Sequence, residues 1–303
     1  MYRFKRLLVH LHLTERDAAI IRYSAMIARM AQAESVHFVH VNPNLDIPPA
    51  ALKAYPELLD ELDTYARKRL SEAVALHWDG PSDAAIHSDV IQGNPLEVLL
   101  RLARSEETDL VVVDRVPGQR PAEVLAEKLA RKAPCSVLAL PDGADSRISR
   151  ILVGVDFSAH SAYAVEIAAA FAAALRLPRI TGLHAYRVPT GFYKSGKSHD
   201  EFAGIMAANA RAAFAEFIRP VDTQGVECHG RYVLAEKGVA DVIAAAIQTE
   251  GVDLVVMGTR GRSDSAAVLL GSVTEALLSL TGVPVLAVKE KGSGLGLLEV
   301  ILK

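Results

Sequence analysis

An internal repeat constrains the fold of this 303-residue chain more than any other feature. The segment RLLVHLHLT at 6–14 aligns with RILVGVDFS at 150–158, and TDLVVVD at 108–114 aligns with VDLVVMG at 252–258. Both alignments have the same offset (150 − 6 = 144 and 252 − 108 = 144). Because a repeat at a fixed offset indicates homologous structural units, the chain is expected to form two similar domains.

The register of the repeat changes once, near the end of each unit. PCSVLAL at 134–140 aligns with GVPVLAV at 282–288, at a larger offset (282 − 134 = 148). The first unit is therefore four residues shorter (148 − 144 = 4) between its fourth and fifth apolar runs. The deletion coincides with a glycine-containing loop of the second unit.

Each unit has the pattern of an α/β domain with a parallel sheet. In the second unit, five short apolar runs predict buried strands at Ile151–Val155, Ile180–His184, Cys228–Leu234, Asp253–Met257 and Pro284–Val288. Helical patterns separate them at Ala159–Leu175, with Ser158 as the expected N-cap, and at Asp200–Ile218 and Val239–Glu250. A last helix is expected from Ser272, where Ser272-Val-Thr-Glu275 predicts a capping box. This alternation predicts two tandem doubly wound, five-stranded Rossmann-like domains, 1–144 and 145–303, joined by the polar linker 141–147.

Composition narrows the class of protein. Half of the residues are hydrophobic, 23% are charged and the net charge is −3, so the basic footprint of a nucleic-acid-binding protein is missing. The two cysteines, Cys135 and Cys228, form no paired motif, which favours a reducing compartment. No apolar run is long enough for a membrane helix or shaped as a signal peptide. We therefore expect a cytoplasmic protein that binds neither nucleic acid nor membranes.

The carboxyl ends of the strands in the second unit have the residues of a nucleotide site. Ligands of open parallel sheets lie beyond these ends. There the sequence places Asp156, the backbone after His184, the loop from Gly258 with Arg260, and a helix start near Gly271. Glycines allow backbone N–H groups to approach an anion, and a helix N-terminus attracts negative charge. These features predict a polyphosphate site.

A second phosphate motif occurs in the same unit. GFYKSGKS at 191–198 matches the P-loop pattern G-x-x-x-x-G-K-[ST] in full. A P-loop leaves its strand directly, however, and here residues 187–190 intervene. We keep three interpretations of this segment: a working P-loop, a polar surface loop, and a lid over the nucleotide.

The second unit resembles the universal stress protein family. The resemblance rests on Gly258-x-x-Gly261, followed after nine residues by Gly271-Ser272, together with Val155-Asp156-x-Ser158 and His184. Because it extends over both units, the chain is similar to the tandem members of the family. Those members pair their last strands internally, which implies a pseudo-dimer within one chain formed by Val137–Leu140 and Val285–Val288.

The resemblance also implies a ligand, namely ATP with Mg²⁺ or Mn²⁺. Asp156 would face the nucleoside, the backbone of Ala185 would meet the adenine edge, and the glycine motif would hold ribose and phosphates. The implied ATP site consists of Val155, Asp156, Phe157, Ala185, Met257, Gly258, Arg260, Gly261, Gly271, Ser272 and Val273.

The first unit departs from this pattern at each point. His10, His12 and Asp114 stand where the second unit has Gly154, Asp156 and Gly258, and the shortened segment 115–124 replaces the later glycines. A carboxylate at Asp114 would repel a phosphate, so we expect no ATP binding in this unit. His10 and His12, with His40 on the neighbouring strand, also have the composition of a metal site. Core histidines are commoner, and no metal site is predicted.

These patterns predict an ATP-binding stress-response regulatory protein. The nucleotide is expected to bind the second domain and to modulate conformation or the binding of an unidentified protein partner. No catalytic residue is assigned, so at most a slow ATPase is expected. Two alternatives remain: a slow nucleotide hydrolase or nucleotidyl transferase, and a nucleotide-free interaction scaffold. Further association into a homodimer is also left open.

Overall fold

The structure is a computed structural model that describes residues 4–42, 58–115, 125–260 and 270–290. Its contacts divide the chain into two compact units, with the boundary between Ser146 and Arg147. This boundary lies inside the polar segment 141–147, where the sequence places the linker. The two units are described separately.

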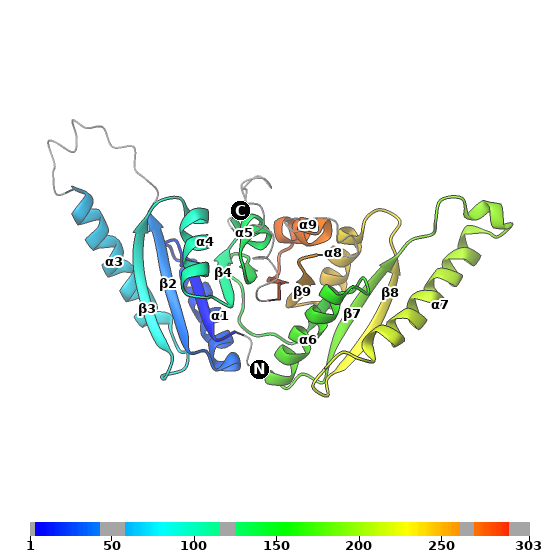
Figure 1. Cartoon of the computed structure of the whole chain (residues 1–303), viewed down its shortest axis with the longest axis horizontal. Coiled ribbons are helices and arrows are strands. Elements are labelled where there is room, and N and C mark those ends of the chain that lie inside the picture. The colour runs from blue at the N-terminus through cyan, green and yellow to red at the C-terminus, as the bar shows by residue number, and fades with distance from the viewer. Residues whose placement is uncertain (1–3, 43–57, 116–124, 261–269, 291–303) are drawn as a thin grey trace, which may run out of the picture. The chain divides into compact units, whose positions relative to one another are not determined.

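The first unit alternates strands and helices along the chain (Figure 1). Its strands lie in the order β3-β2-β1-β4-β5, and all of these neighbours pair in parallel. The elements are β1 (Arg6–Leu11), α1 (Asp17–Ala31), β2 (Ser35–Asn42), α3 (Leu58–His77), β3 (Ala85–Gln92), α4 (Pro95–Ser105), β4 (Leu110–Asp114), α5 (Leu125–Lys132) and β5 (Ser136–Leu140).

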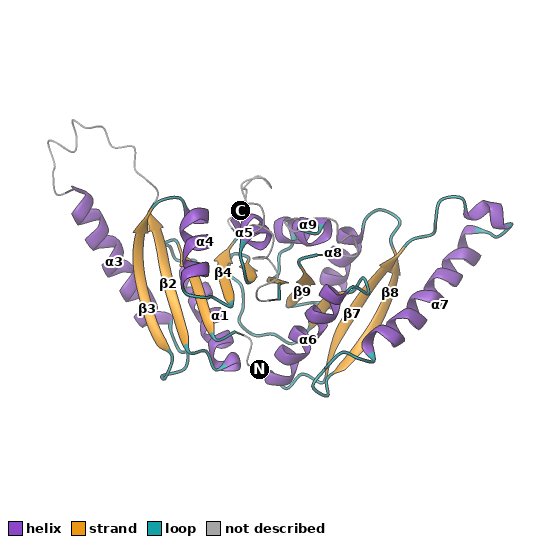
Figure 2. Ribbon diagram, viewed as in Figure 1, coloured by secondary structure: helices purple, strands orange, loops and turns teal. Residues whose placement is uncertain are grey.

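The second unit repeats this topology (Figure 2). Its strand order is β10-β9-β6-β7-β8, again with parallel neighbours. The elements are β6 (Ile151–Gly154), α6 (Ala159–Ala174), β7 (Arg179–Tyr186), the 3₁₀ helix η2 (Phe192–Ser195), α7 (His199–Ile218), β8 (Glu227–Leu234), α8 (Val239–Glu250), β9 (Leu254–Gly258), α9 (Ser272–Leu280) and β10 (Val285–Val288). The predicted fold class, two tandem doubly wound parallel sheets, is confirmed.

The repeat extends to the strand register. Val9 pairs with Val112 across β1 and β4, and Val153 pairs with Val256 across β6 and β9. Each residue of the second pair follows its counterpart at the sequence offset (153 − 9 = 144 and 256 − 112 = 144). Residues related by the alignment therefore occupy equivalent places in the two sheets.

The core of each unit forms around its central strands. In β1 and β4 the side chains of Leu8, Val9 and Val112 are completely buried, as are Val153 and Val255 in β6 and β9. Burial on both faces explains why these runs are continuously apolar instead of alternating. Among the described helices, none is long and apolar enough to cross a membrane.

The predicted capping box at the start of α9 is wrong. Gly271 is the N-cap residue and Ser272 is already the first helical residue. A serine inside the first turn cannot satisfy the N–H groups that an N-cap serine would reach. The N-cap residue itself therefore provides no side-chain acceptor. The predicted pairing of Val137–Leu140 with Val285–Val288 stays a prediction.

Candidate functional site

A cavity of about 240 Å³ lies at the carboxyl ends of β6, β7 and β9. This volume is close to the lower limit of roughly 300 Å³ for small-molecule pockets. Its wall contains these residues of the predicted ATP site: Val155, Asp156, Ala185, Met257, Gly258, Arg260, Gly271, Ser272 and Val273. Strands far apart in the sequence thus bring most of the predicted residues to one place.

Among the described residues of the predicted site, Phe157 is the one that does not line this wall. Gly261 lies outside the described residues. Phe157 has a left-handed backbone (φ 67°), and its ring stacks on His184 with the centroids 4.2 Å apart. Because His184 lines the cavity, this ring contact packs Phe157 against a residue of the wall. Positive φ is uncommon for residues other than glycine and marks a constrained backbone.

His184 joins the exits of two strands. Its Nδ1–H donates to the carbonyl oxygen of Val155 at 2.8 Å. The first unit repeats the contact, since His40 Nδ1 donates to the Leu11 carbonyl at 2.9 Å. A hydrogen bond present in both units, one without the glycine motif, supports a structural role for both histidines.

Asp156 has a structural task as well as a place in the wall. Its Oδ1 accepts hydrogen bonds from the Ser158 N–H at 3.0 Å and the Ser158 hydroxyl at 2.6 Å. The Ser158 oxygen in turn accepts from the Ser161 N–H, which confirms Ser158 as the N-cap of α6. The half-buried carboxylate is thereby held at the cavity in one orientation.

The start of α9 supplies the opposite side of the cavity. Gly271, Ser272, Val273 and Thr274 all line it. The Thr274 hydroxyl donates to the Gly258 carbonyl at 2.9 Å, and the Gly271 N–H donates to the Thr259 carbonyl at 2.9 Å. These bonds attach the first turn of α9 to the end of β9. Because the N-cap residue Gly271 has no side chain, the positive dipole end of α9 lies at the cavity without an N-cap side chain, an arrangement that favours an anion.

Gly258 also has a packing reason to be glycine. A Cβ at this position would lie 3.0 Å from the carbonyl oxygen of His160, in the first turn of α6. Such a contact is too close for backbone atoms that cannot move aside. The glycine thus allows α6 to approach β9, whether or not it touches a ligand.

Other residues of the wall belong to no motif that can be recognised in the sequence. Val239 and Ile243, from the first turns of α8, cover the cavity with apolar side chains, and Gly154, Ser161, Leu183 and Thr274 complete it. Apolar helix residues look alike in a sequence whether they face a core or a pocket. Only the fold identifies them as part of the site.

The P-loop-like segment lies outside the cavity wall. Lys197 is exposed, η2 occupies residues 192–195, and the Ser198 side chain forms a capping box with Glu201 at the start of α7. A P-loop serine or threonine would bind a metal, and its lysine would reach phosphates. In this arrangement neither residue contributes to the site.

The first unit has a polar cluster where the second unit has its cavity. His12 Nε2 lies 2.7 Å from Asp114 Oδ1, and the His10 ring packs edge-on against His12 with the centroids 4.5 Å apart. One ligand atom from each of the three side chains lies within 4.8 Å of the others. Sequence reasoning grouped the two histidines with His40. The structure brings Asp114 to them instead, because β4 lies beside β1.

The two histidines of this cluster differ in charge preference. Burial, assisted by the charge of His12, lowers the pKa of His10 to about 3, so its ring is neutral at pH 7. Burial also acts to lower the pKa of His12, but the hydrogen bond and charge of Asp114 outweigh it and raise that pKa. The cluster therefore combines one neutral imidazole with one imidazole stabilised by a carboxylate.

Comparison with known proteins places both units in one family. The sequence profile of the universal stress protein family matches residues 3–141 and 147–289. Universal stress protein MJ0577 of Methanocaldococcus jannaschii is 43% identical over 51 residues, which are 17% of this chain and 32% of that protein. The match therefore spans about a third of this curated relative.

Solved structures of tandem length show the same fold. A universal stress protein from Archaeoglobus fulgidus superposes with a TM-score of 0.64 at 16% identity, covering 95% of this chain and 97% of that one. A putative universal stress protein from Pseudomonas aeruginosa gives 0.63 at 18% identity, covering 99% and 98%. At these identities the likeness concerns the fold alone.

Proposed function

We propose that this chain, which belongs to the universal stress protein family, binds ATP in the cavity of its second unit. One observation carries the proposal: the N-terminus of α9, whose N-cap is a glycine, and the carboxylate of Asp156 line the same cavity. The first attracts phosphate, and the second accepts hydrogen bonds from ribose hydroxyls or a base amine.

The remaining wall suits the rest of a nucleotide. Arg260 adds positive charge near the phosphate end, and Val239, Ile243 and Met257 provide an apolar surface for the base. The backbone of Ala185 is available to the adenine edge. A few polar groups among apolar side chains are typical of small-molecule sites.

The wall also fits a divalent cation that arrives with the nucleotide. Among the described wall residues, Asp156 is the one carboxylate. Mg²⁺ is usually held through one or two carboxylates together with substrate phosphates and water. Mg²⁺ or Mn²⁺ would neutralise phosphate charge there, while Asp156 and the α9 terminus orient the nucleotide.

We assign this site a regulatory role in the response to stress. The nucleotide would favour the conformation that holds the α9 terminus, Arg260 and Asp156 around it, and so change affinity for a protein partner. A ligand shifts such an equilibrium only by its difference in affinity for the two states. Partner binding should therefore depend on the nucleotide through this cavity.

Calorimetry on the full chain tests the proposal with Mg²⁺ and ATP. We expect Arg260→Gln to weaken ATP binding by roughly tenfold, as loss of one charge-assisted contact implies, and to leave adenosine binding nearly unchanged. Lys197→Ala is the matched control, because it removes a cation from the P-loop-like segment outside the wall. Absence of ATP binding by the wild-type chain would overturn the proposal, and a loss caused only by Lys197→Ala would move the site to residues 191–198.

A further inference from the structure

We propose that His10, His12 and Asp114 form a site for a divalent transition metal, with Zn²⁺ as the reference ion. The site belongs to the first unit, so it does not depend on ATP binding by the second. Two imidazoles and one carboxylate are a donor set that zinc and related metals use in proteins.

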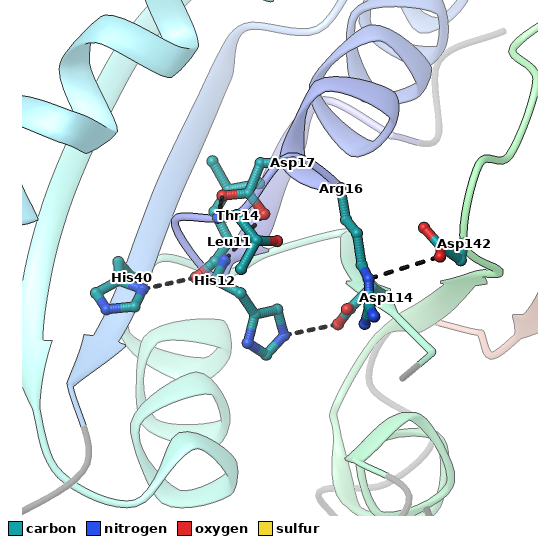
Figure 3. A network of polar contacts seen from close by, with 8 residues as sticks. All are labelled: Leu11, His12, Thr14, Arg16, Asp17, His40, Asp114 and Asp142. Atoms are coloured by element: carbon teal, nitrogen blue, oxygen red, sulfur yellow. Dashed lines mark hydrogen bonds and ion pairs between the residues drawn. The ribbon is translucent and has the colours of Figure 1, made fainter. Parts of the chain in front are cut away.

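The fold brings the three side chains together from two neighbouring strands. His10 lies in β1 and His12 directly after it, so the period of two in an extended chain puts both rings on one face. Asp114 is the last residue of β4, which pairs with β1 in parallel. Figure 3 shows the Asp114 carboxylate directed at the His12 ring.

The spacing needs little adjustment to hold a metal. Zinc bonds of about 2.0–2.2 Å in tetrahedral geometry separate ligand atoms by roughly 3.3 Å. His12 Nε2 and Asp114 Oδ1 are 2.7 Å apart, and the ligand atoms of all three residues lie within 4.8 Å. The metal would replace the proton between His12 and Asp114.

An unpartnered nitrogen gives independent support. His10 is 2% exposed, and its buried Nδ1 has no hydrogen-bond partner among the residues that the structure describes. Buried polar atoms nearly always have a partner, and an exception often marks an ion or water site. Structural packing alone explains the contact between His12 and Asp114, but it leaves this nitrogen unexplained.

Neighbouring groups position the residues of the cluster. The Asp17 carboxylate accepts from the backbone N–H of His12 at 3.0 Å and of Thr14 at 3.2 Å, which positions the His12 segment (Figure 3). His40 uses Nδ1 for the Leu11 carbonyl and Nε2 for Asn42. His40 is thus a supporting residue, and the proposed protein ligands are His10, His12 and Asp114.

The location matches that of the nucleotide cavity in the other unit. Gly154, Asp156 and Gly258, which line that cavity, are the residues equivalent to His10, His12 and Asp114 (10 + 144, 12 + 144 and 114 + 144). The first unit thus has ligating side chains where the second has space. The His12 side chain is 36% exposed, so an ion can enter from solvent and keep an open coordination position.

A metal titration of the full chain tests the site. The chain is stripped with a chelator, kept reduced and free of nucleotide, and titrated with Zn²⁺ against a chromophoric chelator. We expect one Zn²⁺ per chain and at least about hundredfold weaker binding by His12→Asn and Asp114→Asn, since even supporting residues of metal sites change affinity 10–100-fold. Co²⁺ should give the visible absorption of a four- or five-coordinate site.

A matched variant and a second measurement guard against indirect effects. His229→Gln removes a histidine of β8 that lies 3.9 Å from Glu227, and it should bind Zn²⁺ like the wild type. If the site variants do not fold, ring-nitrogen NMR signals of the wild-type chain replace them: Zn²⁺ should move those of His10 and His12. No Zn²⁺ uptake by the wild type, unchanged affinity in both site variants, or movement of other histidines only would each overturn the proposal.

Discussion

Asp156 combines two tasks in one carboxylate. It accepts two hydrogen bonds from Ser158 at the start of α6, and it lines the cavity between β6 and the start of α9. A side chain held by its own neighbours loses little conformational freedom when it meets a ligand. Its equivalent in the first unit, His12, is held in a similar way through its backbone by Asp17.

Replacing Asp156 by asparagine separates these tasks. The amide oxygen keeps the hydrogen bonds from Ser158, so the free energy of unfolding should change by less than about 1 kcal/mol. Loss of the charge should weaken the binding of both ATP and adenosine by about tenfold, because a hydrogen bond to a charged group contributes roughly 1.5–3 kcal/mol. Calorimetry and thermal unfolding measure the two effects.

Asp156→Ala is the companion variant, since it removes the charge and the acceptor together. It should lose stability by about 1 kcal/mol as well as affinity. Tighter ATP binding by Asp156→Asn, with adenosine unchanged, would contradict this assignment and place the carboxylate beside the phosphates.

Among the described secondary-structure elements, α9 carries the strongest functional signal because its N-cap residue, Gly271, has no side chain to accept from the first N–H groups. Gly271 precedes it with φ −61° and ψ 135°, a conformation open to any residue. The site therefore does not require glycine at this position for backbone reasons. A side chain there would instead compete with a ligand for the helix N–H groups.

Gly271→Asp should therefore change stability and binding in opposite directions. An aspartate at the N-cap accepts from the first N–H groups and interacts with the helix dipole, which should raise the free energy of unfolding by about 0.5 kcal/mol. The same charge should weaken ATP binding at least tenfold, since it occupies the anion site.

Chemical denaturation and calorimetry measure this pair of effects, with Gly271→Ala as the uncharged control. The alanine variant should bind ATP better than the aspartate variant does. Equal ATP affinity in the aspartate variant and the wild type would show that the α9 terminus does not meet the phosphates.

Across the full chain, the two units share a topology and a register but differ in what occupies equivalent places. The second has a cavity lined by Gly154, Asp156 and Gly258, and the first has the His10–His12–Asp114 cluster. With the two proposed sites, one unit would bind a nucleotide and the other a metal ion.

This asymmetry predicts the stoichiometry of binding. The chain should bind one ATP. Saturation of the first unit with Zn²⁺ should leave the ATP affinity within about twofold of its value without Zn²⁺, as expected for sites without a shared residue. Calorimetry with ATP, with and without Zn²⁺, measures both quantities. Two equivalent ATP sites, or loss of ATP binding on addition of Zn²⁺, would contradict the division of roles.

Much of this architecture is readable in the sequence because it depends on local patterns. The apolar runs, the helical segments between them and the offset of 144 residues predict the parallel sheets, and Ser158 is recognisable as an N-cap. Alternation and repetition need no knowledge of distant contacts. The glycine motif likewise identifies the part of the wall at the end of β9 and the start of α9, since its spacing follows one strand and one helix start.

Other features depend on which strands become neighbours, and only the tertiary structure decides them. Asp114 meets His12 across 102 positions of sequence because β4 pairs with β1, whereas sequence spacing favoured His40. The P-loop match at 191–198 and the apparent capping box at Ser272 both fit their sequence patterns. In the structure, however, Ser198 caps α7, and Ser272 lies inside α9 after the N-cap residue Gly271. By itself the sequence determined the repeat, the fold class and the family resemblance. The position of the start of α9 at the cavity, and the grouping of His10, His12 and Asp114 in the other unit, came from long-range packing that no local pattern encodes.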